Sequence, residues 1–339
     1  MREDDLKYMK RALELAGRGA GSVSPNPMVG AVLVKDGEII GEGFHRYDKL
    51  KHAESYAIAK AGGEARGSTL YCTLEPCSHH GRTPPCTGAL IEAGISRAVI
   101  AMTDPDRRVN GQGIVQLREA GIKVEVGLCE FEAGRLNEFY LKFVTRGKPF
   151  VHALLVRETG YAGGWEPSEA LLSEASEYDA IILGSDPSVN RIFVANGLSR
   201  ERHRPLIVAG DQLILELQDL PDGSLKAVLS APSLAEAKVL VGSGATGPDS
   251  NALLVWLARL QATSALILPG KLSPRDSDDF EVVDRVTALT SSGTAQAGSD
   301  SRPGALLGDV RPEGRDVERA GEHSEISGYL RATGSAKEI

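Results

Sequence analysis

Two cysteines lie nine positions apart in the stretch TLEPCSHHGRTPPC, residues 73–86, and each of them follows a proline. Such a pair can form a disulfide, pack as small apolar side chains, or bind a metal ion. The cytoplasm keeps thiols reduced, and four cysteines in 339 residues do not suggest a disulfide framework. Metal binding and packing therefore remain open for Cys77 and Cys86.

A histidine in the stretch KHAES, residues 51–55, adds a nitrogen to these two sulfurs. His52, Cys77 and Cys86 would be three protein ligands for a zinc ion, and three ligands leave the fourth position open, as in catalytic zinc sites. Glu54 is then the candidate for moving protons, as a general acid and base rather than a ligand. Because residues i and i+2 do not face each other in a regular helix, the chain must pass from loop to helix between His52 and Glu54.

Each of these residues also has an ordinary interpretation. His52 could be a surface histidine, Glu54 a solvated carboxylate at a helix start, and both cysteines buried apolar side chains. Taken together, however, His-x-Glu followed by two Pro-Cys pairs is the arrangement of the zinc deaminases. The combination favours a hydrolytic zinc site.

Composition limits the classes to which the protein can belong. The chain has 42% apolar and 25% charged residues, as in ordinary globular proteins, and its length predicts two domains. Residues 1–150 carry 21 Lys and Arg against 19 Asp and Glu, which leaves 17 against 27 for residues 151–339. This balance argues against nucleic acid as a partner. No apolar run of membrane-spanning length and no signal peptide are visible, so we expect no membrane partner and a cytoplasmic location.

Alternating helix and strand patterns organise the first half of the chain. Residues 5–17 have helical apolar spacing, and residues 28–45 predict a β-hairpin with its turn at Asp36 and Gly37. Further helices are expected over 52–62, 87–93 and 113–121, with strands over 68–74, 97–102 and 122–127. This alternation predicts a layered α/β domain over residues 1–147.

A second α/β pattern begins at Lys148. Strands are expected at 149–156, 179–184, 205–210, 238–244 and 264–270, and helices at 168–177 and 251–261. Residues 290–339 are rich in Gly, Ser and charge, and they contain few large apolar side chains. Such a segment cannot offset its ordering entropy by burial, so we expect domains at 1–147 and 148–289 and a disordered tail over 290–339.

The motifs HAE at 52–54, TLEPCSHHGRTPPC, SPNPMVGAVLVKDGEIIGEGFH at 24–45 and TDP at 103–105 closely resemble one known family. It is the bifunctional riboflavin-biosynthesis deaminase/reductase family, and the resemblance covers residues 1 to about 150. It implies a cytidine deaminase-like three-layer α/β/α domain followed by a dihydrofolate reductase-like α/β domain. It also implies zinc-dependent deamination of a small phosphorylated pyrimidine, 2,5-diamino-6-(5-phosphoribosylamino)pyrimidin-4(3H)-one.

The resemblance assigns roles to individual positions. Zinc falls to His52, Cys77 and Cys86, and proton transfer to Glu54. Asn26 and His45 would contact the base, while His79, Arg82 and Asp104 would shape the site around the base and the ribose phosphate. The family often has Asn-Pro where this chain has Asp106 and Arg107, which leaves the part of Asp106 open. Cys72 and Cys129 lie in apolar surroundings and are expected to be structural.

The second domain departs from the family's reductase pattern. The family's strand lysine falls on Leu154, its Ser-Leu-Asp-Gly on residues 157–160, and its Glu-Gly on Gly242 and Ser243. A glycine-rich loop with Gly242, Gly244 and Gly247 could still cradle a phosphate, although turn chemistry also explains it. We therefore expect a degenerate reductase domain, with NADPH as a cofactor only if this domain is active.

Three hypotheses follow from these observations. The first is a zinc deaminase with an inactive second domain, which can also serve in a homo-oligomer. The second is a bifunctional enzyme that also reduces the ribosyl product with NADPH. The third is a non-catalytic, zinc-stabilised scaffold for a pathway partner, although a structural zinc needs neither Glu54 nor an open position.

Overall fold

The computed structural model divides into two compact units, Met1–Gly147 and Lys148–Ile339. The residues that it describes are 4–47, 51–79, 84–157, 169–182, 206–209, 212–214, 216–219, 225–228, 250–259, 261–267, 284–291, 313–320 and 323–329. Arg82, the strand expected at 238–244 and the loop with Gly242, Gly244 and Gly247 lie outside these residues. Among the described residues, no helix has the length and apolar character needed to cross a bilayer.

A mixed sheet forms the centre of the first unit, in the strand order β2-β1-β3-β4-β5. Its strands are β1 (Gly30–Lys35), β2 (Glu38–Phe44), β3 (Thr69–Cys72), β4 (Arg97–Ile100) and β5 (Lys123–Val126). The pair β1/β2 is the expected hairpin, and Asp36 and Gly37 form its two-residue turn with φ of 51° and 83°. Positive φ at both positions is what Asp-Gly turns of this length require.

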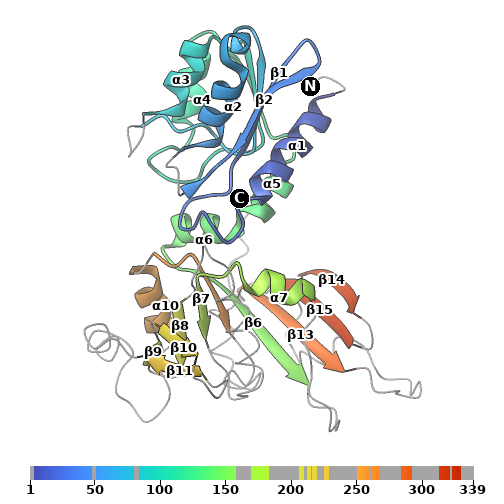
Figure 1. Cartoon of the computed structure of the whole chain (residues 1–339), viewed down its shortest axis with the longest axis vertical. Coiled ribbons are helices and arrows are strands. Elements are labelled where there is room, and N and C mark those ends of the chain that lie inside the picture. The colour runs from blue at the N-terminus through green and yellow to red at the C-terminus, as the bar shows by residue number, and fades with distance from the viewer. Residues whose placement is uncertain are drawn as a thin grey trace. The chain divides into compact units, whose positions relative to one another are not determined.

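Helices cover both faces of this sheet and make three layers (Figure 1). On one face, α2 (Ala53–Ala61), α3 (Cys86–Ala93) and α4 (Gln112–Glu119) enclose a core with the buried side of β1 and β4. On the other face, α1 (Asp5–Gly17) and α5 (Glu130–Leu136) pack over the same strands. A short 3-10 helix, η2 (Gly62–Ala65), follows α2, and α6 (Glu138–Arg146) ends the unit. The expectation of a layered α/β domain is confirmed.

Two glycines of β2 allow α2 to approach the sheet closely. A Cβ atom added at Gly41 would meet the backbone carbonyl of Ala57, and one added at Gly43 would meet Tyr56 and the carbonyl of Ala53. The backbone of α2 therefore lies directly on β2. Because His52 immediately precedes α2, this contact fixes where the metal-binding candidate lies.

A buried ionic cluster attaches α1 to the sheet. The Arg97 guanidinium on β4 donates to both oxygens of Asp5 at 2.8 and 2.7 Å, and the Tyr71 hydroxyl donates to Asp5 at 2.7 Å. Arg97 also donates to Glu125 at 3.0 Å. A buried pair of this kind is hard to break, because the partner that remains would be an uncompensated charge.

The second unit contains a larger mixed sheet, in the strand order β14-β15-β13-β6-β12-β7-β8-β9. Its central neighbours from β13 to β8 run parallel, whereas β9, β15 and β14 pair antiparallel to theirs. These strands are β6 (Phe150–Arg157), β7 (Ala180–Ile182), β8 (Leu206–Ala209), β9 (Gln212–Ile214), β12 (Ser264–Ile267), β13 (Arg285–Ser291), β14 (Glu313–Ala320) and β15 (His323–Tyr329). The helices are α7 (Glu169–Ala175) and α10 (Ser250–Arg259), and a separate hairpin joins β10 (Glu216–Asp219) to β11 (Leu225–Val228).

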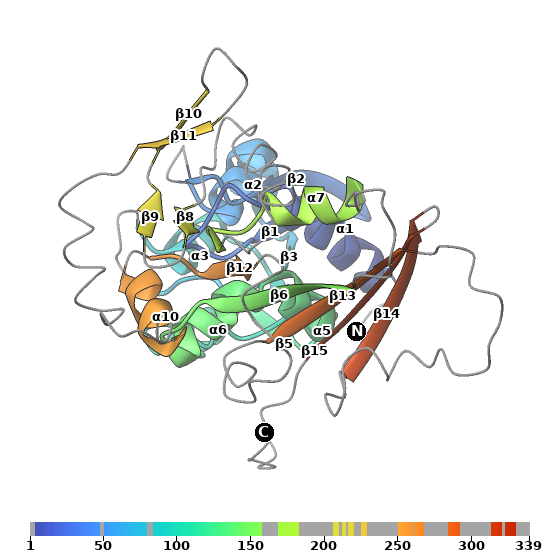
Figure 2. The same ribbon diagram turned by 90° about the horizontal axis from the view of Figure 1, so that it is seen from below.

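Two segments of residues 290–339, for which the sequence predicts disorder, form strands β14 and β15 in this structure. Figure 2 shows β6, β13, β15 and β14 side by side, and β15 pairs with β13 from Arg285↔Tyr329 to Ser291↔His323. Composition did not reveal these strands, because backbone hydrogen bonds to neighbouring strands hold them and they contain few large apolar side chains.

Candidate metal centre and active site

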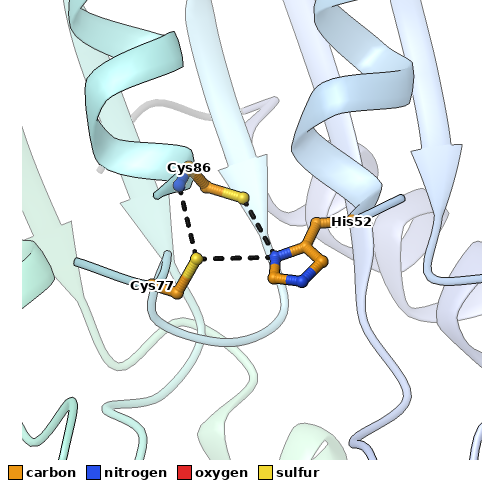
Figure 3. Close-up of side chains that lie close together, drawn as sticks. All are labelled: His52, Cys77 and Cys86. Carbon is orange, nitrogen blue, oxygen red and sulfur yellow. Dashed lines mark hydrogen bonds between the residues drawn. The ribbon is translucent and has the colours of Figure 1, made fainter. Parts of the chain in front are cut away.

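Three side chains from two separate segments of the first unit converge at one point (Figure 3). Nδ1 of His52 lies 3.2 Å from Sγ of Cys86 and 3.5 Å from Sγ of Cys77. The backbone N–H of Cys86 donates to Sγ of Cys77 at 3.3 Å. His52 precedes the first residue of α2, Cys77 lies in the loop after β3, and Cys86 begins α3. The structure therefore brings together the three residues that the sequence singled out.

These distances suit a zinc ion. Bonds of about 2.3 Å to sulfur and about 2.0 Å to nitrogen, at tetrahedral angles, place the S and N atoms about 3.5 Å apart. The three candidate ligand atoms all lie within 4.8 Å of one another. Hydrogen bonds from the Cys86 thiol and from His52 lower the pKa of Cys77, so one sulfur is prepared as a thiolate. The donor set fits zinc, and it contains three ligands.

Glu54 lies beside this cluster, in the first turn of α2. The backbone of His52 is extended, with φ −78° and ψ 159°, and the helix begins at Ala53. This is the loop-to-helix junction that the spacing of His52 and Glu54 required. The Glu54 side chain is buried and interacts with Cys86. Burial, and then the charge of Cys77, raise the pKa of its carboxyl, which favours a group that can both hold and release a proton.

His45 lies next to His52, and Asn26 lies next to His45. Nδ2 of Asn26 lies 3.4 Å from Nε2 of His45, and the His45 ring contacts the His52 ring edge-on at 5.5 Å between centroids. Burial lowers the pKa of His45 to about 4, so its ring is neutral at physiological pH. Asn26 is exposed, and its amide can present both a donor and an acceptor.

Asp104 lies in the segment that follows β4. Its side chain is buried, and its carboxylate accepts from the backbone N–H of Asp106 at 2.9 Å and from the Tyr140 hydroxyl at 3.0 Å. Burial raises the pKa of Asp104 to about 6. Asp106 itself is paired with Arg108, whose guanidinium donates to it at 2.5 Å.

His79 lies in the loop after β3, two residues after Cys77. Its Nδ1 is buried and has no hydrogen-bond partner among the described residues. A ring nitrogen of this kind is available to a ligand.

Sequence reasoning missed the residue that joins the cysteine loop to the Asp104 segment. Glu75 is buried, and its carboxylate accepts from the backbone N–H groups of Asp104 at 3.2 Å, Gly111 at 2.8 Å and Gly113 at 2.8 Å. Gly113 is closely packed, because a Cβ atom there would meet the carbonyl of Pro76. Glu75 stands within the TLEPC motif, two residues before Cys77, and that position was the only signal of its role in the sequence.

Comparisons with known proteins match this site and its surroundings. Residues 2–102 match the family model for the cytidine and deoxycytidylate deaminase zinc-binding region. The riboflavin biosynthesis protein RibD of Aquifex aeolicus is 51% identical over 151 residues, 44% of this chain and 42% of that protein. The Escherichia coli RibD is 52% identical over 151 residues, 44% of this chain and 41% of that protein. The chain thus spans less than half the length of these curated relatives.

The whole chain resembles a solved structure from Thermotoga maritima, described as a diaminohydroxyphosphoribosylaminopyrimidine deaminase/5-amino-6-(5-phosphoribosylamino)uracil reductase. The TM-score is 0.72 at 28% sequence identity, over 96% of this chain and 99% of that one. The chain is therefore similar in fold, over nearly its whole length, to this deaminase/reductase. The cytidine deaminase-like and reductase-like folds that the sequence motifs implied are therefore confirmed.

The four cysteines of this chain are free, and they differ in their surroundings. Cys72 on β3 is fully buried in the core, and burial together with the charge of Glu54 raises the pKa of its thiol. Cys129 lies not in a strand but directly before α5, with a φ of 60°. Neither belongs to the group that could hold a metal ion among the described residues.

The second unit has an apolar side chain at the position where the resemblance to the family places a lysine. Leu154 lies on β6, is 1% exposed, and pairs with Thr287 of β13. A leucine at this position offers neither a charge nor a hydrogen-bond donor from its side chain.

Proposed function

We propose that the first unit catalyses the zinc-dependent hydrolytic deamination of a pyrimidine. The observation that carries the proposal is the convergence of His52, Cys77 and Cys86 with the buried Glu54 beside them. A bound zinc ion would lower the pKa of a coordinated water to about 7 and so supply a nucleophile at neutral pH.

The side chains of this site suit the transfers that the reaction needs. Glu54 would accept a proton from the attacking water and deliver it to the amino group, which leaves as ammonia when its C–N bond breaks. The raised pKa of Glu54 supports both directions of this transfer. Asn26 and His45 would orient the pyrimidinone by hydrogen bonds, and Asp104 and His79 would contact the part of the substrate that carries the ribose.

The family supports a particular substrate. We infer that it is the diamino-ribosylamino-pyrimidinone 5'-phosphate named above, which loses its 2-amino group to leave a uracil. Arg82, which the resemblance assigns to the phosphate, has a guanidinium that matches phosphate geometry. The cytoplasmic location and a homo-oligomer remain predictions from the sequence.

One substitution tests the mechanism directly. Glu54→Gln keeps the size of the side chain but cannot carry the proton, so ammonia release should fall by about 10²-fold or more while the zinc content stays at one ion per chain. The matched control is Glu64→Gln, because Glu64 is an exposed carboxylate paired with Lys35. Full activity in Glu54→Gln would remove Glu54 from the mechanism.

We also propose that the second unit does not reduce the product. The buried Leu154 supports this proposal, since the family's lysine is missing there. Incubation of the full chain with the diamino compound and NADPH should yield ammonia and the uracil product without oxidation of NADPH. Consumption of NADPH in step with product would establish the bifunctional alternative, and absence of any ammonia would favour the scaffold.

A further inference from the structure

Helix α6 and the residue before it lie beyond the stretch 2–102 that matches the deaminase family model. Two polar side chains from its N-terminal turn nevertheless reach the segments that carry Asn26 and Asp104. One is Asn137, which joins α5 to α6, and the other is Tyr140.

Asn137 holds the backbone next to Asn26. Its Oδ1 accepts from the N–H of Met28 at 2.7 Å, and its Nδ2 donates to the carbonyl of Met28 at 2.9 Å. The Asn137 side chain is only 2% exposed. One amide thus pairs with both backbone groups of a residue 109 positions away, which restricts the orientation of the Asn26–Met28 segment.

Tyr140 holds the carboxylate of Asp104. Its hydroxyl lies 3.0 Å from Oδ1 and 3.1 Å from Oδ2, so its single proton is donated between the two oxygens. Asp104 is 6% exposed, and the backbone N–H of Asp106 is the second donor to Oδ1. The Tyr140 hydrogen bond opposes the effect of burial on the pKa of Asp104, so it favours the charged form that accepts hydrogen bonds.

We propose that α6 is a positioning element of the substrate site, in which Tyr140 orients Asp104 and Asn137 orients the Asn26 segment. This inference rests on the proposed function. Neither side chain needs to touch the substrate. Each fixes a group that would contact it, and the loss of a contact that is equally strong in the ground and transition states raises KM with little change in kcat.

The test compares two tyrosines that make the same bond. Tyr140→Phe removes the hydroxyl that donates to the buried Asp104. Tyr71→Phe removes the hydroxyl that donates, at 2.7 Å, to the buried Asp5 on α1. We expect KM for the diamino compound to rise about tenfold in Tyr140→Phe, with kcat changed less than about threefold and with zinc content unchanged. Tyr71→Phe should leave KM at the wild-type value although it lowers the thermal midpoint.

A second pair of variants tests the other half of the proposal. Asn137→Asp replaces the Nδ2 donor with an oxygen that faces the Met28 carbonyl, and it should also raise KM. Its control is Asn110→Asp, at an exposed position before α4. Because Tyr140→Phe loses only one oxygen atom, it keeps the test decisive if Asn137→Asp fails to fold.

The outcomes separate this inference from the function on which it rests. A wild-type KM in Tyr140→Phe, or an equal rise in KM in Tyr71→Phe, would show that α6 contributes stability alone and would overturn the inference. If the wild-type protein releases no ammonia from the diamino compound, the proposed function fails, and the inference fails with it.

Discussion

At the scale of single residues, burial gives the ionisable groups of the site their chemical character. It raises the pKa of Glu54 and Asp104 and lowers that of His45, so the carboxyls hold protons more readily and the imidazole stays neutral. Hydrogen bonds from other parts of the chain oppose the effect of burial on the pKa, as the Tyr140 hydroxyl does for Asp104. Holding a buried carboxyl in its charged form at neutral pH costs folding free energy, and that cost can be measured.

Asp104→Asn should stabilise the protein at neutral pH. The pKa of Asp104 is raised to about 6 in the folded state. The folded protein therefore binds this proton more tightly than the unfolded chain, whose pKa is near 4, and stability falls as the pH rises from about 4 to about 6. A carboxyl held charged above that range costs at most about 3 kcal/mol.

Thermal unfolding at several pH values measures this effect. The midpoint of Asp104→Asn minus that of the wild type should grow between about pH 4 and about pH 6 and then stay constant. Asp36→Asn, at the exposed hairpin turn, is the control and should show no such trend. A midpoint difference that is the same at every pH would contradict the assignment. Ammonia release by Asp104→Asn should fall, because the amide cannot replace a charged acceptor.

At the scale of elements, the site depends on how closely α2 and the cysteine loop approach the sheet. Gly41 and Gly43 let the α2 backbone lie on β2, and Glu75 ties the loop after β3 to the start of α4. Short, close contacts of this kind leave little freedom in the position of His52 relative to Cys77 and Cys86.

Gly43→Ala should displace α2 and weaken zinc binding. The added methyl group would meet Tyr56 and the Ala53 carbonyl, and overpacking of this kind costs about 1–3 kcal/mol. We expect a lower thermal midpoint and a zinc affinity reduced by about tenfold, measured by titration of the metal-free protein. Gly63→Ala is the control, because no atom lies within 4 Å of the Cβ position there. Unchanged zinc affinity in Gly43→Ala would show that α2 does not set the ligand geometry.

Sequence patterns predicted the elements that carry strong local signals. The Asp36-Gly37 turn and the helical spacing over residues 5–17 were accessible because each depends on neighbouring residue types. The candidate ligand set was accessible because its residues stand in two motifs that together resemble the zinc deaminases. The contacts of Glu75 and Tyr140 were not, because their partners lie 29 or more positions away. Helices α5 and α6 were also missed.

At the scale of the whole chain, two compact units differ in charge. The ligands of the candidate metal centre and Glu54 all lie within Met1–Gly147. Residues 1–150 carry 21 basic and 19 acidic side chains. The acidic excess lies in residues 151–339, which carry 17 basic and 27 acidic side chains. An anionic substrate therefore meets less electrostatic opposition in the first unit.

Removal of the metal should affect the two units differently. A chelator should abolish ammonia release and lower the midpoint of one thermal transition. The unit that holds the ligands loses the stabilisation by bound zinc, which is about 4 kcal/mol when the free zinc concentration is a thousand times Kd. A second transition, which belongs to the unit without the ligand cluster, should stay in place. Zinc should restore both properties, whereas magnesium, which prefers oxygen ligands, should not. An equal shift of both transitions would contradict a metal site confined to the first unit.

The burial of Cys72 has a consequence for the kind of centre that this fold can build. Cys72 is close enough to Glu54 and Cys77 for their charges to affect its thiol, yet it is fully buried and its pKa is raised. A third thiolate joining His52 and the other two sulfurs would give the saturated Cys₃His coordination of zinc-finger-type proteins, which has no room for a reactant. Among the described residues, the Cys72 sulfur is not one of the ligand atoms that lie together, so a zinc ion held by His52, Cys77 and Cys86 would keep its fourth position for solvent or substrate.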